Sequence, residues 1–311
     1  MISVCYMTNR LDPRLDWFLD ALHAQVGGVW NGIQFVVVDF NHDERSKSMQ
    51  YVSQYNRIVL GGGKVTLSAP KPNVWQGKHR LSKIDYFAAA NARNTAICLA
   101  AGDTIVFADD LSVPLPTWWS AVLEASKKRD TVTCGAYRKV KDLVVTNGSV
   151  TSFTDHPAGT DMRMRDLSGP PPYPCMPGWH FGCSIVAPIE AYLGINGWPE
   201  ACDGLGYEDC VTGIAMHHNG WKFQYDTRMM TYESEELHGK DKPFMRWDKG
   251  QSPNDKSHAM LAMFRNARRF ENYFDPPGIV ALRQRVLAGE PFPIQQIPEH
   301  DWYDGMPVRD M

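Results

Sequence analysis

Short apolar runs alternate with helical patterns along the first third of the chain. Residues 2–7 and 35–38 are largely apolar and β-branched runs, which are typical of strands that a parallel sheet buries on both faces. Between them, apolar side chains recur at helical spacing from Leu15 to Val26, and the glycines at 27–28 end this predicted helix. A strand, a helix and a second strand in this order predict parallel pairing of the two strands.

The same alternation continues as far as residue 129. Residues 57–60 predict a short strand, and we interpret the glycine triplet at 61–63 as a turn, because no Lys-Ser/Thr pair follows it. An alanine-rich helix is predicted over 81–101, a buried strand over 104–108 and a helix over 116–129. This order predicts an α/β fold, a three-layer sandwich with a mostly parallel central sheet.

The second half of the chain has a more mixed pattern. Residues 143–153 predict a hairpin whose turn is the Asn-Gly pair at 147–148. Residues 155–180 are rich in proline, glycine and charged side chains, and they predict a long loop. The remaining predicted elements are a strand over 183–187, helices over 208–219 and 253–272, and one short helix after Pro276.

Composition excludes several classes of protein. Hydrophobic residues make up 43% of the chain and charged residues 22%, which excludes wholesale disorder. The net charge of −3 gives no basic field for nucleic acid or an anionic membrane. Seven cysteines without a CxxC pair favour reduced thiols over zinc or redox motifs. Since no signal peptide and no apolar run of ~20 residues is found, we expect a cytoplasmic protein without a membrane span.

Three predicted strands end in polar residues, at 8–10, at Asp39 and at Asp109-Asp110. Because the carboxyl ends of parallel strands meet at one edge of a sheet, these groups are expected to face one crevice. Adjacent carboxylates are costly unless a cation or hydrogen-bond donors neutralise them. Asp109 and Asp110 therefore indicate a divalent metal, or alternatively a helix cap beside a solvated acid.

Acidic and histidine side chains also occur around the predicted helix that begins at Glu208. Glu208 and Asp209 in its first turn favour the helix dipole, and donors there would also keep a general base ionised. His217 and His218 near its end favour the negative end of the same dipole, with metal ligation as the alternative. His238 follows a predicted strand and is a candidate ligand for Mg²⁺ or Mn²⁺ beside a carboxylate.

In order and spacing, the strand ends together with residues 92–94 and 107–114 resemble the nucleotide-sugar half of family 2 glycosyltransferases. Residues 181–184, 196–200 and 206–209 resemble the acceptor half of the same family. The resemblance implies a GT-A (Rossmann-like) fold. It also implies a catalytic domain over 1–240, with a nucleotide-sugar half (1–115) and an acceptor half (116–240), followed by a C-terminal helical extension and tail over 241–311.

The resemblance also implies roles for single residues. Asp209, beside Glu208, would be the catalytic base, and the metal would be held by Asp110 and His238. Aromatic side chains would stack on sugar or acceptor, with core packing as the alternative for each: Trp179, Trp198 and Tyr207. The donor would contact Thr8, Asn9, Arg10, Asp39, Arg93, Asp109 and Trp179, with Asp39 reading a uracil edge.

Two positions depart from the family pattern. Leu111 replaces the third acid after Asp109 and Asp110, which leaves a two-Asp variant in which we favour Asp110 as the metal ligand. Phe40 replaces the acid that often follows the aspartate of the second strand, and this weakens the case for uridine over another base.

The sequence as a whole predicts an inverting, metal-dependent glycosyltransferase. It would move a sugar from a nucleoside-diphosphate sugar, UDP-linked in the favoured interpretation, to an acceptor hydroxyl with Mn²⁺ or Mg²⁺ as cofactor. The alternatives are a nucleotidyltransferase, or a catalytically inactive relative that binds carbohydrate or nucleic acid. The acceptor stays open among a glycan, a lipid-linked sugar, a protein, a small molecule and a modified DNA base.

Overall fold

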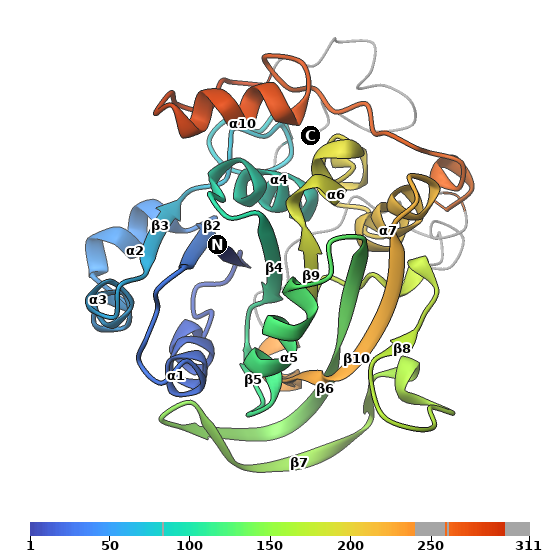
Figure 1. Ribbon diagram of the computed structural model, residues 1–311. Coiled ribbons are helices and arrows are strands. Elements are labelled where there is room, and N and C mark those ends of the chain that lie inside the picture. The colour runs from blue at the N-terminus through green and yellow to red at the C-terminus, as the bar shows by residue number, and fades with distance from the viewer. Residues whose placement is uncertain (83, 240–258, 260, 296–311) are drawn as a thin grey trace.

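A parallel sheet forms the first half of the protein in the computed structural model, which describes residues 1–82, 84–239, 259 and 261–295 (Figure 1). Matching positions such as Val4, Phe35 and Val106 lie side by side in its register. The four parallel strands are β1 (Ile2–Thr8), β2 (Ile33–Asp39), β3 (Lys64–Ser68) and β4 (Thr104–Asp109).

The second half extends the same sheet, so that ten strands are connected within the described residues. The order along the sheet is β3-β2-β1-β4-β9-β6-β10-β5, and β6 and β10 are parallel to each other. The six added strands are β5 (Ser112–Pro114), β6 (Thr131–Thr146), β7 (Ser149–Thr160), β8 (Tyr173–Pro174), β9 (Ser184–Pro188) and β10 (Lys222–Ser234).

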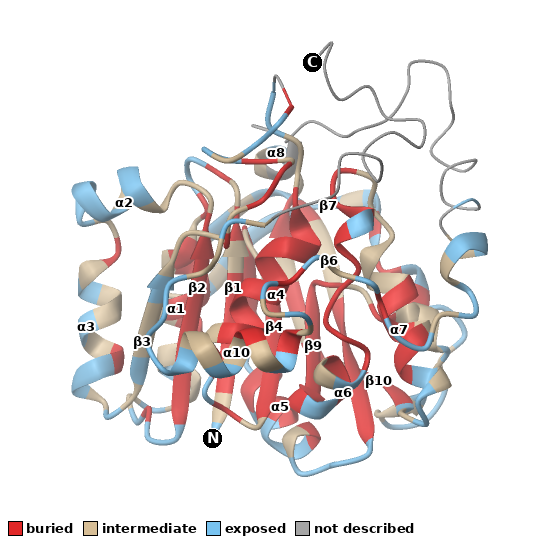
Figure 2. Ribbon diagram, turned by 90° about the horizontal axis from the view of Figure 1, so that it is seen from above, coloured by how far each residue is buried: buried red, intermediate tan, exposed pale blue. Residues whose placement is uncertain are grey.

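Helices cover both faces of the sheet, because alternate strand residues point to opposite sides. On one face, Val4 and Phe35 pack with α1 (Leu15–Gln25), α3 (Val52–Leu60) and α5 (Trp118–Ser126). On the other, Cys5, Val36 and Phe107 pack with α4 (Ala89–Leu99), α6 (Ile189–Gly194), α7 (Glu208–His218) and α10 (Ile279–Leu287). Figure 2 shows this buried centre between exposed outer helices such as α2 (His42–Ser48). The three-layer α/β prediction is confirmed.

Two local predictions are wrong. Residues 57–60 are the last turn of α3, in which Ile58 is buried while Val59 and Leu60 are exposed, and the strand β3 follows the glycine turn instead. A run of four apolar residues is too short to separate the two periodicities.

The helix predicted from residue 81 begins only at Ala89. Its first turn receives a cap from a distant residue, since Oδ1 of Asp203 accepts hydrogen bonds from the backbone N–H of Ala90 at 2.8 Å and of Asn91 at 3.4 Å. The preceding segment is irregular and is fixed by side chains, such as Gln76, which accepts from the Ala88 N–H at 3.1 Å. A helix start that depends on a partner more than 100 residues away leaves no local signal in the sequence.

The long loop predicted over 155–180 is only partly irregular. β7 continues to Thr160, β8 pairs with β10, and the 3₁₀ helices η1 (Met162–Met164) and η2 (Pro177–Trp179) fall in the same segment. At the other end of β7, the predicted Asn147-Gly148 hairpin turn is confirmed. Gly148 has a φ of +74°, and a Cβ there would collide with the backbone of α1 at Ala21.

A buried ion pair fixes the segment that follows β7. Arg163, 1% exposed, donates hydrogen bonds to the buried carboxylate of Asp161 and to the carbonyl of Trp179 at 2.6 Å. Its guanidinium carbon also lies 4.4 Å from the ring centre of Phe181 and 4.7 Å from that of Tyr225. One arginine thus connects η1, η2 and β10.

The C-terminal extension is described in part. Of the helix predicted over 253–272, residues 253–258 and 260 lie outside the described residues. Residues 259 and 261–264 are helical, but 265–272 form turns and irregular structure, so the predicted helix end is wrong. The short helix after Pro276 is confirmed as α10. Ile279 and Leu282 of α10 are buried in the same core as α4. None of the described helices has the length and apolar character needed to cross a membrane. All seven cysteines are free thiols.

Removal of Asp161 tests the importance of the buried pair. Asp161→Ala leaves the Arg163 guanidinium buried without its counter-ion, and we expect a loss of about 3–5 kcal/mol in the free energy of unfolding. Asp155→Ala removes the partner of Arg138 from an exposed pair and serves as the control, with an expected loss of about 0–1 kcal/mol. Urea unfolding of both variants measures the difference, and equal effects would contradict the proposed role of the pair.

Candidate active site

A cavity of about 360 Å³ lies at the carboxyl ends of β1 and β4, beside the first turns of α4 and α7. This is the edge at which α/β sheets bind ligands. Most of the residues selected from the sequence line it: Thr8, Asn9, Arg10, Arg93, Asp109, Asp110, Glu208 and Asp209. The ends of β1 and β4 therefore meet at one cavity, as predicted, and the start of α7 lies beside them.

Asp110 is held by the loop that follows β1. Its Oδ2 accepts a hydrogen bond from the Thr8 hydroxyl at 2.8 Å, and its Oδ1 accepts one from Nε of Arg10 at 3.1 Å. Burial raises the pKa of Asp110 to about 6, against the opposing effect of Arg10. Arg10 also donates to the carbonyl of Leu237 at 3.1 Å, which connects this loop to α8 (Glu235–Gly239).

Arg93 of α4 joins the two acidic pairs. Its Nη1 donates to Glu208 at 2.7 Å, and its Nη2 lies 3.6 Å from Oδ1 of Asp109. The guanidinium lies over the Trp198 ring, 4.5 Å from the ring centre. Gly182 leaves room for this arrangement, because a Cβ there would collide with Nη2 of Arg93.

Asp209 has the environment of a proton acceptor. It has no ion pair within the described residues, and its Oδ1 accepts a hydrogen bond from the Cys210 N–H at 2.7 Å. Burial, followed by the nearby Glu208 carboxylate, raises the pKa of Asp209 to about 6. A carboxylate of this kind is ionised at neutral pH and titrates close to it, as general bases do.

His180 fixes the backbone of Asp209 through a side-chain contact. Burial lowers the pKa of His180 to about 3, so its ring is neutral. Its Nδ1 lies 3.1 Å from the carbonyl oxygen of Asp209 and must carry the proton, because a carbonyl only accepts. The sequence analysis did not select His180, since nothing near it in the chain marks this contact.

Asp39 lies outside the cavity lining. It is buried, its Oδ1 accepts from the Asn41 N–H at 2.8 Å, and its Oδ2 is bonded to Nε of Arg45. The neighbouring residue Phe40 lines the cavity instead. Arg45 was not selected from the sequence, because an arginine in a short exposed helix has no distinctive pattern.

The three aromatic candidates have different surroundings. Trp198 is fully buried and stacks on Tyr192 at 5.8 Å, so core packing, the alternative considered for it, is what the structure shows. Trp179 is half-buried, lies outside the cavity lining and packs edge-on against Tyr225 at 5.6 Å. Tyr207 precedes α7 with a φ of +67°, and its side chain is half-buried.

The acidic groups fit a divalent cation. Four carboxylates and two guanidinium groups line the cavity, which leaves two negative charges in excess. Carboxylate oxygens are the ligands that Mg²⁺ and Mn²⁺ prefer, and the Asp109 side chain is 40% exposed. Within the described residues, no three His, Cys, Asp or Glu side chains surround one point. His238 lies in α8, and its side chain is outside the described part of the structure.

Glu233 of β10 is a further acid that the sequence analysis missed. It is buried, pairs with Ser112 of β5 in the sheet register, and its Oε1 has no hydrogen-bond partner among the residues that the structure describes. Burial, followed by the Asp109 carboxylate, raises the pKa of Glu233 to about 8. At neutral pH the Glu233 side chain is therefore largely protonated, and it lies near the aspartate pair.

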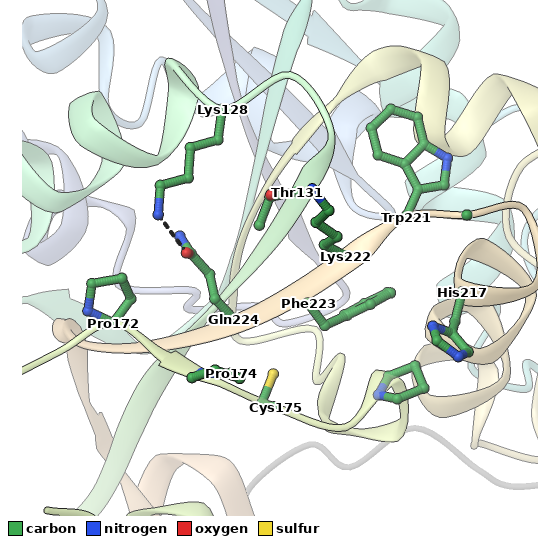
Figure 3. A pocket seen from close by; sticks show the side chains of 12 residues that line it. Lys128, Thr131, Pro172, Pro174, Cys175, His217, Trp221, Lys222, Phe223 and Gln224 are labelled. Atoms are coloured by element: carbon green, nitrogen blue, oxygen red, sulfur yellow. Dashed lines mark hydrogen bonds between the residues drawn. The ribbon is translucent and has the colours of Figure 1, made fainter.

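A second, larger cavity of about 590 Å³ lies at the other end of the sheet. Figure 3 shows Trp221, Phe223 and His217 around it, and Lys128 donating to Gln224 at 2.5 Å. No carboxylate lines this cavity, and it lies where β6 and β10 begin rather than where strands end. The acidic cavity is therefore the candidate active site.

No protein-family model and no curated protein matches the sequence. Among solved structures, the chain is similar to S. aureus TarS 1–349 in complex with UDP-GlcNAc, with a TM-score of 0.52 and 13% identity over 84% of this chain and 65% of that one. It is also similar to GalNAc-T7 with UDP, GalNAc and Mn²⁺, with a TM-score of 0.49 and 14% identity over 84% of this chain and 47% of that one. The chain thus spans about two thirds and about half of these structures.

The likeness to TarS bears on the fold, since 13% identity says little about chemistry. The GT-A fold implied by the sequence resemblance is confirmed: this chain has a GT-A-like fold.

Proposed function

We propose that the protein is an inverting glycosyltransferase that moves a sugar from a nucleoside-diphosphate sugar to an acceptor hydroxyl. One observation carries the proposal. The acid pair at the end of β4 and the acid pair at the start of α7 face one cavity, and Arg93 contacts Asp109 and Glu208, one member of each pair. Such an arrangement provides a site for a charged leaving group beside a site for a base.

The donor would bind on the side of the aspartate pair. Asp109 and Asp110, with His238 as a further candidate, would hold Mn²⁺ or Mg²⁺, and the bound cation would neutralise charge on the departing diphosphate. Thr8 and Arg10 are hydrogen-bonded to Asp110, Arg93 lies 3.6 Å from Asp109, and Asn9 lines the same cavity. UDP is the nucleotide that the sequence resemblance favours, whereas Asp39 and Trp179, the two other donor contacts that the resemblance implies, lie outside the cavity lining.

The acceptor would bind beside Asp209. Its carboxylate takes the proton of the acceptor hydroxyl as the oxygen attacks the anomeric carbon from the face opposite the diphosphate. The new carbon–oxygen bond forms as the bond to the phosphate oxygen breaks, which inverts the anomeric configuration. Glu208 is occupied by Arg93 and is less suited to this role.

The nucleotidyltransferase alternative has less support. Such enzymes usually carry a glycine-rich, basic loop after the first strand. Residues 8–12 contain one arginine and no glycine. An inactive relative would not need an unpaired acid with a pKa near 6 beside an aspartate pair.

A thermal-shift screen of nucleotide sugars, with and without Mn²⁺, tests the proposal directly. Ligands that bind the native state raise the melting temperature by mass action. We expect at least one nucleotide sugar to raise it only when Mn²⁺ is present, and this sugar should then be hydrolysed slowly or transferred. The absence of any shift across the screen would contradict the proposed function.

Substitution of Asp110 tests the metal site. We expect Asp110→Asn to abolish Mn²⁺-dependent binding of UDP, because it removes a charged ligand while keeping the side-chain shape. Calorimetric titration of UDP with and without Mn²⁺ measures this. An unchanged Mn²⁺-dependent affinity would remove Asp110 from the metal site.

Substitution of Asp209 separates a base from a helix cap. Asn is a comparable cap, so Asp209→Asn should cost little if Asp209 only caps α7. If Asp209 is the base, transfer should fall by ~10²–10⁴ with donor affinity nearly unchanged. Glu208→Gln is the control next to it and should lose less activity. Near-normal transfer in Asp209→Asn would contradict the mechanism.

The pH dependence follows from the raised pKa of Asp209. Protonation below pH about 6 removes the base, so kcat/KM should fall about tenfold per pH unit there and level off above about pH 7. The apparent value belongs to the Asp209–Glu208 pair. A profile measured from pH about 5 to 8 checks this, and a flat profile would count against a carboxylate base.

A further inference from the structure

Two kinds of side chain line the candidate donor cavity. The acidic pairs, Arg10 and Arg93 suit phosphates, a cation and sugar hydroxyls. The apolar lining residues are Met7, Phe40, Phe87, Ala89 and Ala92. A flat nucleobase matches an apolar and aromatic lining, because every base has a π-face that can lie on an aromatic ring.

Asp39 is not available to read a base edge. The Asp39 and Arg45 side chains are only 4% and 8% exposed, and each oxygen of the Asp39 carboxylate already accepts a hydrogen bond. A uracil N–H would have to reach a carboxylate that the protein covers almost entirely and that already accepts from the Asn41 N–H and from Nε and Nη2 of Arg45. To expose this carboxylate, a ligand would have to disturb a buried ion pair, which is costly.

Arg45 connects Asp39 to the loop after β1. Besides Asp39, its guanidinium donates to the carbonyls of Arg10 at 2.6 Å and Leu11 at 3.1 Å. It also donates to Gln50 at 2.8 Å. The Asp39–Arg45 pair therefore fixes the loop that carries Thr8 and Arg10, rather than facing the cavity itself.

Phe40, unlike Asp39, lines the cavity. Its backbone N–H donates to the Thr8 carbonyl at 3.0 Å, which fixes it against the end of β1. Its side chain is half-buried and lines the cavity, as Phe87 also does. A ring held in this way offers a stacking surface that does not depend on the hydrogen-bond pattern of the base.

We propose that the donor site hardly selects the base: Phe40 is the base-stacking residue, and Asp39 is a positioning residue that acts through Arg45. The donors would be nucleoside-diphosphate sugars with pyrimidine or purine bases alike. This inference rests on the proposed function.

Calorimetric titration of the full chain with UDP, GDP and ADP in Mn²⁺ tests the inference. We expect the three dissociation constants to agree within about tenfold, since stacking is tolerant of base identity. Phe40→Leu, which keeps the apolar volume but removes the ring, should weaken all three by at least ~5-fold, the lower limit for loss of one stacked base. Phe40→Tyr is the matched control and should keep the affinity for all three.

The Asp39 variant distinguishes positioning from base reading. Asp39→Asn should weaken UDP, GDP and ADP to a similar extent, because the shared loop is disturbed. A loss confined to UDP, or a preference of wild type for UDP by more than about 100-fold, would overturn the inference. Unchanged binding in Phe40→Leu would also overturn it while leaving glycosyl transfer in place. If none of the three nucleotides binds, the proposed function fails and the inference with it.

Discussion

The arrangement of the site depends on the buried guanidinium of Arg93 between acids from two parts of the fold. Asp109 ends β4 and Glu208 begins α7, and without a cation between them these carboxylates would repel each other in a poorly solvated cavity. The guanidinium lies over the Trp198 ring, and the missing side chain at Gly182 leaves room for it there. The strand end, the helix start and the segment at 182 are thus arranged around one side chain.

This constraint gives two adjacent acids different properties. Glu208 is neutralised by a direct hydrogen bond from Arg93, whereas Asp209 accepts from the backbone N–H and the thiol of Cys210, and its pKa is raised to about 6. Neighbouring carboxyl groups whose environments differ in this way commonly divide the work of a reaction. His180 contributes by holding the Asp209 carbonyl with a neutral ring, which adds no positive charge beside the proposed base.

The sequence predicted most of the sheet and the strand-end residues of the site, because a strand buried on both faces has a local apolar signature. The contacts that complete the site have no such signature, since they join residues far apart in the chain. Asp203 caps α4 across 113 residues, and Glu208 reaches Arg93 across 115. The partner of Asp39 is close in sequence, but Arg45 lies on an exposed helix whose composition is unremarkable. The order of the motifs could therefore place the acids, but it could not show which of them are paired with an arginine.

Contacts within the protein fix the loop that carries Thr8 and Arg10. The Thr8 hydroxyl accepts from the Arg10 N–H at 3.1 Å and donates to Asp110, while Arg45 holds the Arg10 carbonyl from the opposite side. A loop fixed in this way loses little conformational entropy on binding, so more of the contact energy remains as affinity. Selectivity among donors is then decided by groups that still face the cavity, and at the end of β2 that group is Phe40 rather than Asp39.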